Sequence, residues 1–215
     1  MFAALVLVTC AAHAQDDGRA PRRWTFEAFG GDALNADSNL RIQQTSQPEL
    51  DFTADWTTGG TGSPYAGGRI GWGRGDRMTE WEHLHHKILL TNNPPEVQDF
   101  QISDGLIFEM INVAEERDGW IFRYGGGVVV AHPESTVRGQ RLTRSGGFFD
   151  TGQRLSGAVA QYAVERRFYV ADDWFLAAET KGTVCYVDVP VMGGRAQTWN
   201  FALHGLLGFG YQWED

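Results

Sequence analysis

TWNFALHGLLGFGYQW, residues 198–213, is the stretch of the chain that decides the fold. Alternate positions in it carry large apolar or aromatic side chains, interrupted by Gly205: Phe201, Leu203, Leu207, Phe209, Tyr211 and Trp213. The positions between them are small or polar, apart from Leu206. Because successive side chains of a β-strand point to opposite faces, the stretch predicts a strand with one apolar face and one small, polar face.

The same period of two recurs upstream in seven segments, which predict seven further strands. They are residues 23–31, 65–74, 78–90, 100–114, 119–132, 154–169 and 173–188. The 215-residue chain has no run of 18 apolar residues, which excludes a transmembrane helix. Eight strands in one domain of this length fit either a soluble β-sandwich or a membrane β-barrel.

The connections between the predicted strands decide between these two folds. Three are short (74–77, 115–119 and 170–173), and they alternate with four long ones (32–64, 91–99, 133–153 and 189–197). Short periplasmic turns alternating with long external loops are typical of outer-membrane barrels, and a sandwich has no reason for this asymmetry. Residues 23–215 are therefore predicted to form an all-β, eight-stranded antiparallel up-and-down transmembrane β-barrel.

The two ends of the chain predict export and assembly. Residues 1–14, MFAALVLVTCAAHA, have the apolar run and the small-x-small end of a secretory signal cleaved after Ala14, although no charged start precedes the run. Cleavage leaves residues 15–22 as a short periplasmic segment and Cys185 as the lone cysteine, so we expect no disulfide in the mature chain. At the other end, Gly208-x-x-Tyr211-x-Trp213 resembles the terminal-strand signal read by the barrel-assembly machinery. The expected location is the cell outer membrane, in contact with its bilayer.

The net charge of −9 argues against a nucleic-acid partner, because phosphate binding needs clustered Lys and Arg. Eight strands enclose a lumen that side chains fill, so no open pore is expected. Ten residues are predicted to point inward: Glu27, Arg69, Glu80, Glu82, Arg123, Gln161, Glu165, Glu179, Lys181 and His204. Unpartnered buried charges are costly, so these mixed charges are expected to form a paired network.

The densest group of reactive side chains is residues 80–87, EWEHLHHK. An exported N-terminus makes segment 78–90 ascend from the periplasm, which places His85 and His86 roughly 15–20 Å above the turn, at the depth of lipid A in the outer leaflet. Strand alternation places His83, His85 and Lys87 on the face of Trp81, which predicts that His85 and Lys87 point to lipid, and it places His86 on the other face. Imidazoles beside carboxylates suit acid–base catalysis or divalent metal binding, but a plainly polar interface has the same pattern.

A second group lies at the external ends of the next two predicted strands. Asp104 stands near the start of segment 100–114, and His132 and Glu134 share a face at the end of segment 119–132. Adjacent strands bring these ends close to His86, so His86, His132 and Glu134 are candidate ligands of a divalent transition metal. A hydrated, charged rim of the barrel is the alternative interpretation of the same residues.

The order of short motifs along residues 24–213 resembles the lipid A oxidase-like outer-membrane barrels, of the opacity-type eight-stranded architecture. The motifs are DFTADW (51–56), Pro64-Tyr65-x-Gly67-x-Arg69, His85-x-Lys87, Ser103-Asp104-Gly105, Gly125-Gly126-Gly127, His132-x-Glu134 and Tyr186-Val187-Asp188-Val189. The resemblance implies an enzyme that oxidises the proximal glucosamine of lipid A with dioxygen. The expected catalytic residues are His85, His86, Lys87, Asp104, His132 and Glu134, which are candidates from their placement and are not carried over from the family.

Two other functions stay open from the sequence. A barrel esterase that deacylates lipid A would carry a His-x-Ser strand motif, and no His-x-Ser occurs in the chain. A structural or adhesive barrel would leave lipid A unmodified.

Overall fold

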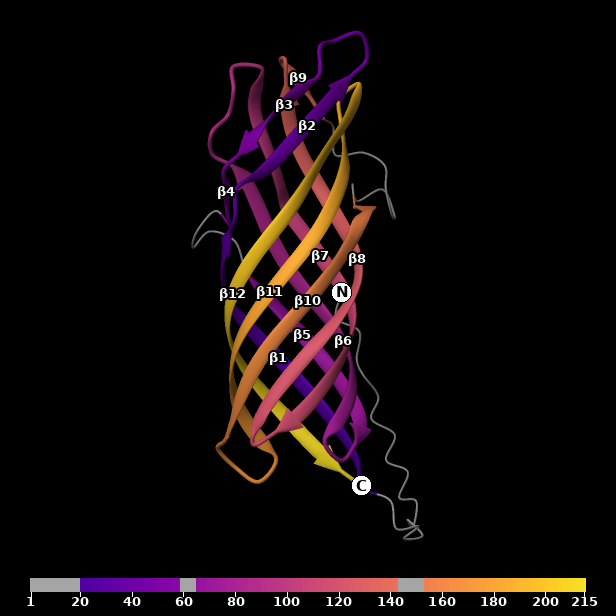
Figure 1. Ribbon diagram of the computed structural model, residues 1–215, viewed down its shortest axis with the longest axis vertical. Coiled ribbons are helices and arrows are strands. Elements are labelled where there is room, and N and C mark those ends of the chain that lie inside the picture. Colours follow the sequence, from indigo (N-terminus) through magenta and orange to yellow (C-terminus); the bar gives the residue numbers. More distant parts are fainter. Residues whose placement is uncertain (1–19, 59–64, 143–152) are drawn as a thin grey trace, which may run out of the picture.

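A computed structural model of the chain describes residues 20–58, 65–142 and 153–215, and it leaves the side chains of residues 103–105 undescribed. The predicted signal peptide, residues 1–14, lies outside this part. Eight long strands form the wall of the barrel (Figure 1). They are β1 (Arg22–Asn35), β5 (Ala66–Arg74), β6 (Arg77–Leu90), β7 (Val97–Arg117), β8 (Trp120–Val137), β10 (Arg154–Tyr169), β11 (Trp174–Val191) and β12 (Gly194–Glu214). Each predicted strand is confirmed, and no helix among the described residues is long and apolar enough to cross a membrane.

The sheet closes because β1 pairs antiparallel with both β5 and β12. The ladders, followed once around the wall from Trp24, return to β1 at Leu34, ten positions further along. With about 3.4 Å per residue and 4.8 Å between strands, this stagger corresponds to a strand tilt of about 40°. Each step from β1 towards β5 and β6 therefore climbs about 3 Å along the barrel axis.

The three predicted short turns are confirmed at the end of the barrel where the C-terminus lies (Figure 1). Gly75 and Gly119 there have φ angles of 59° and 73°, which glycine adopts without strain. The opposite end differs from the prediction, since residues 189–197 are not a long loop. β11 and β12 continue to Val191 and from Gly194, and a two-residue turn joins them, because Val189, Val191 and Ala196 alternate inward into an apolar core.

The predicted 32–64 loop also contains regular structure. β2 (Ser38–Gln44) and β3 (Leu50–Ala54) form a hairpin that extends the sheet beside β12 (Figure 1). Leu40 and Ile42 of β2 are fully buried, which explains the pairing. Two further pieces, β4 (Trp56–Thr57) and β9 (Gln140–Arg141), pair with β6 and β8.

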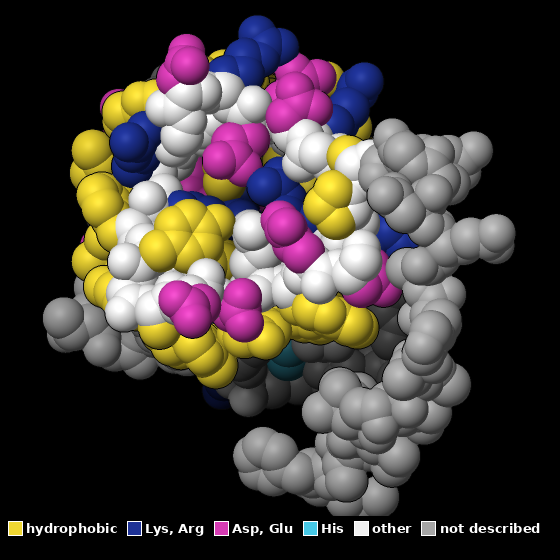
Figure 2. Space-filling model, turned by 90° about the horizontal axis from the view of Figure 1, so that it is seen from below, with side chains coloured by type: hydrophobic (Ala, Val, Ile, Leu, Met, Phe, Trp, Pro, Cys, Tyr) yellow, Lys and Arg dark blue, Asp and Glu magenta, His cyan; other side chains and the backbone are white. Residues whose placement is uncertain are grey.

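The outer surface of the wall is apolar and bounded by aromatic side chains. Leu203, Leu207 and Phe209 of β12 are 53%, 73% and 48% exposed, as a lipid-facing strand requires. At the end with the short turns the rings of Trp24 and Trp72 lie 6.3 Å apart, and Trp199 contacts Tyr186 near the other end of the apolar zone. Seen from the end with the short turns, charged side chains gather inside the ring of strands and hydrophobic ones around much of its rim (Figure 2).

The half of the lumen nearest the short turns holds an ionic network. Its members are Glu27, Glu80, Glu82, Glu165, Glu179, Arg69, Arg123, Arg167 and Lys181. Arg69 Nη1 lies 2.6 Å from a carboxylate oxygen of Glu165 and 2.8 Å from one of Glu179. All ten residues predicted to point inward are buried, so the predicted paired network is confirmed.

The other half of the lumen is an apolar core, built from residues such as Leu106, Phe108, Val187 and the free Cys185. His86 and His204 lie between the two halves, with ring centroids 5.2 Å apart. The hydroxyl of Thr183 is 2.8 Å from His204 Nε2. Charged side chains thus line one half of the described lumen, and apolar side chains line the other.

Candidate functional site

The outer face of β6 carries a row of polar side chains. Trp81, His83, His85 and Lys87 alternate with Glu80, Glu82, Leu84 and His86, and the second set is fully buried in the lumen. The first set is partly exposed on the outside of the wall. The predicted faces are therefore confirmed: His85 and Lys87 point outward, and His86 points inward.

The stagger of the ladders fixes the depth of this row. Relative to the level of Trp24, His83 lies about 15 Å, His85 about 20 Å and Lys87 about 25 Å further along the barrel axis. The apolar band of such barrels is about 25 Å tall, measured between its aromatic girdles. The row thus runs from just past the middle of the band to its outer edge.

Glu109 of β7 completes the row through its cross-strand pair with His83. Its two carboxylate oxygens have different partners: one lies 2.6 Å from His83 Nδ1, and the other accepts a hydrogen bond of 3.1 Å from Trp81 Nε1. The His83 and Glu109 side chains are 40% and 32% exposed, on the outside of the barrel. Because Glu109 engages Nδ1, the Nε2 atom of His83 is the ring nitrogen that can reach a molecule beside the wall.

This placement of a carboxylate is energetically unfavourable. An acidic side chain inside the apolar band costs on the order of 2 kcal/mol, and ionisable residues at such positions generally mark function. The hydrogen bonds from Trp81 and His83 offset part of that cost. Other outward positions of β7 carry ordinary apolar residues, such as Ile107 and Ile111, so the fold itself does not require Glu109.

The other predicted site residues do not converge on this row. His86 Nε2 lies 3.1 Å from Asn35 Oδ1 inside the lumen, and its ring packs against Tyr65 and Phe108. His132 and Glu134 alternate along β8 with Ala131, which belongs to the apolar core, so they lie on the opposite face of the wall from His86. The strand ends do meet in height, since Leu106 pairs with both His86 and Ala131.

The side chain of Asp104 lies outside the described part of the structure. Among the described residues, no group of three or more His, Cys, Asp or Glu side chains is placed to hold a metal ion. The transition metal stays a prediction from the sequence.

The sequence does not predict the contact between His83 and Glu109, although each residue is unusual at its own position. Glu109 interrupts the apolar outer face of segment 100–114, between Ile107 and Ile111. An acidic residue in that position is a signal of function, but only the register of β6 against β7 reveals its partner.

The fold is that of the eight-stranded outer-membrane β-barrels. The structure resembles that of outer membrane protein AlkL solved in lipid bilayers, with a TM-score of 0.52 and 10% identity over 97% of this chain and 98% of AlkL. Two further barrels match with lower TM-scores. For OprG from Pseudomonas aeruginosa the TM-score is 0.42, with 9% identity over 92% of this chain and 98% of OprG. For Ail of Yersinia pestis the TM-score is 0.41, with 9% identity over 90% of this chain and 99% of Ail. No protein-family model and no curated protein sequence matches the chain. Identities this low relate folds alone.

Proposed function

We propose that this protein is an outer-membrane enzyme that modifies lipid A, with its reactive groups on the outer face of β6 and β7. One observation carries the proposal: an imidazole–carboxylate pair, His83 and Glu109, faces the bilayer in its outer half. Lipid is the medium that this face meets, and in an outer membrane the outer leaflet is where lipid A lies. His85 and Lys87, nearer the outer edge of the apolar band, suit the anionic headgroup of that lipid.

The pair is suited to general-base catalysis. Glu109 orients the His83 ring through Nδ1 and stabilises the imidazolium that forms, while Nε2 accepts a proton from a hydroxyl group of the substrate. Trp81 holds the second oxygen of Glu109 and so fixes the carboxylate.

Oxidation of the proximal glucosamine is the reaction that the family resemblance favours. Two electrons and two protons leave the anomeric carbon and its hydroxyl group, and dioxygen accepts them as hydrogen peroxide. Water then opens the resulting lactone to an aminogluconate, so the lipid gains one oxygen atom. His83 takes the hydroxyl proton in this scheme, and Lys87 and His85 position the headgroup.

Mass spectrometry of lipid A from cells with and without the gene tests the proposal. We expect a gain of one oxygen in cells that carry the gene, and its loss in the His83→Gln and Glu109→Gln variants. Thr79→Val, on the same outer face of β6 but nearer the periplasmic turn, is the matched control and should keep the modification. Loss of an acyl chain from lipid A would show deacylation and not oxidation. Unchanged lipid A would contradict the proposal that the protein is an enzyme.

A structural or adhesive role is the second candidate. The hairpin of β2 and β3 beyond the apolar band favours it, because its exposed charges, such as Arg41 and Asp51 at 3.1 Å, could contact another surface. Unchanged lipid A together with loss of surface binding on deleting residues 38–54 would support that role.

A further inference from the structure

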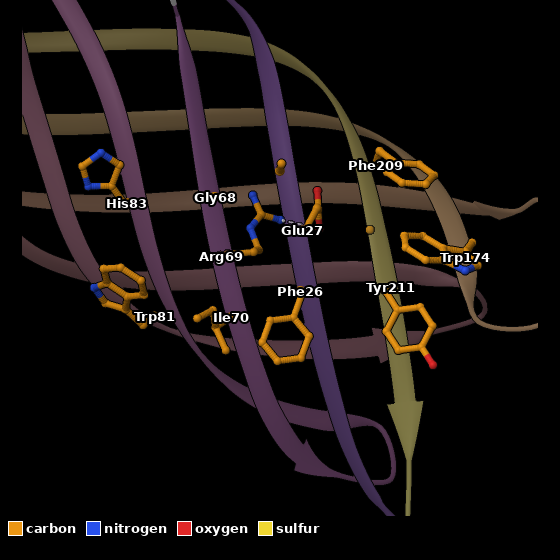
Figure 3. A pocket seen from close by; sticks show the side chains of 12 residues that line it. Phe26, Glu27, Gly68, Arg69, Ile70, Trp81, His83, Trp174, Phe209 and Tyr211 are labelled. Atoms are coloured by element: carbon orange, nitrogen blue, oxygen red, sulfur yellow. Dashed lines mark ion pairs between the residues drawn. The ribbon is translucent and has the colours of Figure 1, made fainter. Parts of the chain in front are cut away.

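A groove runs along the lipid-facing wall beside His83. Its volume is about 570 Å³, and it spans β11, β12, β1, β5 and β6. His83 and Trp81 stand on one side of it, and Phe209 and Trp174 stand on the other (Figure 3). The lining is almost entirely apolar, because the side chains of Glu27 and Arg69 are buried and form an ion pair with each other (Figure 3).

The groove exists because neighbouring outward positions have almost no side chain. Ala28 pairs with Gly68 in the floor of the groove, and the next outward pair, Gly30 and Ala66, continues this run of small residues just beyond the groove. A Cβ atom at Gly68 would lie 3.3 Å from the main-chain oxygen of Glu27, which leaves the backbone itself as the floor. Large side chains such as Trp81 and Phe209 rise around this floor.

The groove and the polar row are parts of one surface. His83 pairs with Gly68 and lines the groove, whereas His85 pairs with Ala66 just beyond it, so the polar row starts at the groove and continues past its outer end. The floor residues Ala28 and Gly68 lie about 10–13 Å beyond the level of Trp24, and Lys87 lies about 25 Å beyond it. A molecule that filled the groove would therefore have an apolar part over Ala28 and Gly68 and a polar part beside His85 and Lys87.

We propose that this groove binds one acyl chain of an outer-leaflet lipid whose anionic headgroup lies against His85 and Lys87. Charge complementarity selects the occupant: the outer end of the surface is basic, and both oxygens of the nearby Glu109 are already engaged by Trp81 and His83. A second barrel is disfavoured as the occupant, because its wall would be convex and would not fill a recess. The inference rests on the proposed function, since it assigns the acyl chain of the same substrate to a defined part of the wall.

The gain on binding is modest, because lipid tails are already in an apolar medium and only closer packing is added. Native mass spectrometry of the full mature barrel, released from vesicles that mix lipid A with phosphatidylcholine, measures how much lipid A each variant retains. Ala28→Leu and Gly68→Leu fill the groove and should reduce retained lipid A about three- to ten-fold. Gly205→Leu is the matched control: it adds the same side chain to an outward position where a Cβ atom meets nothing within 4 Å, outside the groove.

Equal retention of lipid A by Ala28→Leu and Gly205→Leu would overturn the inference, as would groove-dependent dimers without bound lipid. Retention that falls in Ala28→Leu and Gly68→Leu but not in Gly205→Leu supports it, with Lys87→Gln expected to release lipid A in favour of phosphatidylcholine. This readout is independent of catalysis. Unmodified lipid A in cells with groove-dependent retention would reject only the enzyme, whereas modified lipid A with groove-independent retention would reject only the groove.

Discussion

The two halves of the lumen are built on opposite principles. The half near the short turns buries charges such as Arg69, Arg123 and Glu179, which pair with one another. The half towards the β2–β3 hairpin buries aliphatic and aromatic side chains such as Leu106 and Phe108. The change falls at His86 and His204, about 20–25 Å beyond the level of Trp24 and close to the outer edge of the apolar band.

The difference shows that the polarity of the lumen depends on whether the outer face of the wall meets lipid or water at the same level. Where the wall faces lipid, apolar side chains gain nothing by turning inward, and a polar lumen makes the two faces of each strand distinguishable. Beyond the band the outer face meets water, as the exposed Arg41 and Asp51 indicate, so burial of apolar side chains stabilises that half as it does a soluble protein. Variants in each half test this division.

The largest effect is expected from Arg123→Met in the ionic half. Arg123 contacts Glu80 and Glu179 and lies 3.2 Å from Glu165, so its loss leaves buried carboxylates without a partner. We expect the free energy of unfolding to fall by about 3–5 kcal/mol, measured by urea unfolding in lipid vesicles. Arg166→Met is the control, because its guanidinium lies outside, 5.3 Å from the Trp120 ring, and should lose about 1 kcal/mol or less. Equal losses would contradict the network.

Leu106→Ala tests the apolar half by the same measurement. Leu106 is fully buried, and its truncation leaves a cavity that should reduce the free energy of unfolding by about 2–4 kcal/mol. Leu207→Ala removes the same atoms from the lipid-facing side, where lipid fills the space, and should have less than half that effect. If the two variants lost the same stability, the second half of the lumen would not be a packed core.

A reciprocal pair on β11 sharpens the position of the boundary. Val187→Thr introduces a hydroxyl group into the apolar half, which should cost about 1–3 kcal/mol. Thr183→Val, four residues nearer the ionic half, removes the hydroxyl group 2.8 Å from His204 Nε2 and should cost about 1 kcal/mol. A gain of stability in either variant would place the boundary elsewhere.

The smallest effect concerns the hairpin outside the band. Hydrogen bonds from Asn39 and then Arg41 hold the pKa of Asp51 below its ordinary value. The contribution of Asp51 to the hairpin is therefore present above about pH 4 and is lost as the pH falls through the lowered pKa. Exchange of the Ile42 amide should accelerate in acid relative to an Asp51→Asn variant at the same pH. If the exchange rate of the Ile42 amide changed with pH in the same way in both proteins, the hydrogen bonds of Asp51 would not stabilise the hairpin.

The sequence predicts the wall of the barrel well, because one period of two runs through every spanning strand. The direction of each charged residue follows from the same period, from Glu27 to Lys181, and so does the outward direction of His85. The sequence pattern does not predict the hairpin of β2 and β3, because these strands are short. Their two fully buried residues, Leu40 and Ile42, are too few to stand out in a long polar segment.

The candidate site is predicted less well, for a geometric reason. Counting residues along adjacent strands places His86 and His132 at one height, but height does not determine the side of the wall. The pair that does meet, His83 and Glu109, depends on the register between β6 and β7, which no single strand encodes.

The pairing of β1 with β12 has a consequence for how the chain folds. These strands come from opposite ends of the described chain, and Trp24 lies directly across from Trp213. The last ladder therefore carries the largest loop-closure entropy, and folding is expected to be slow because it waits for the whole chain. Until that ladder forms, two long strand edges remain open to pairing with other chains, so the polypeptide needs protection from aggregation until the ring is complete.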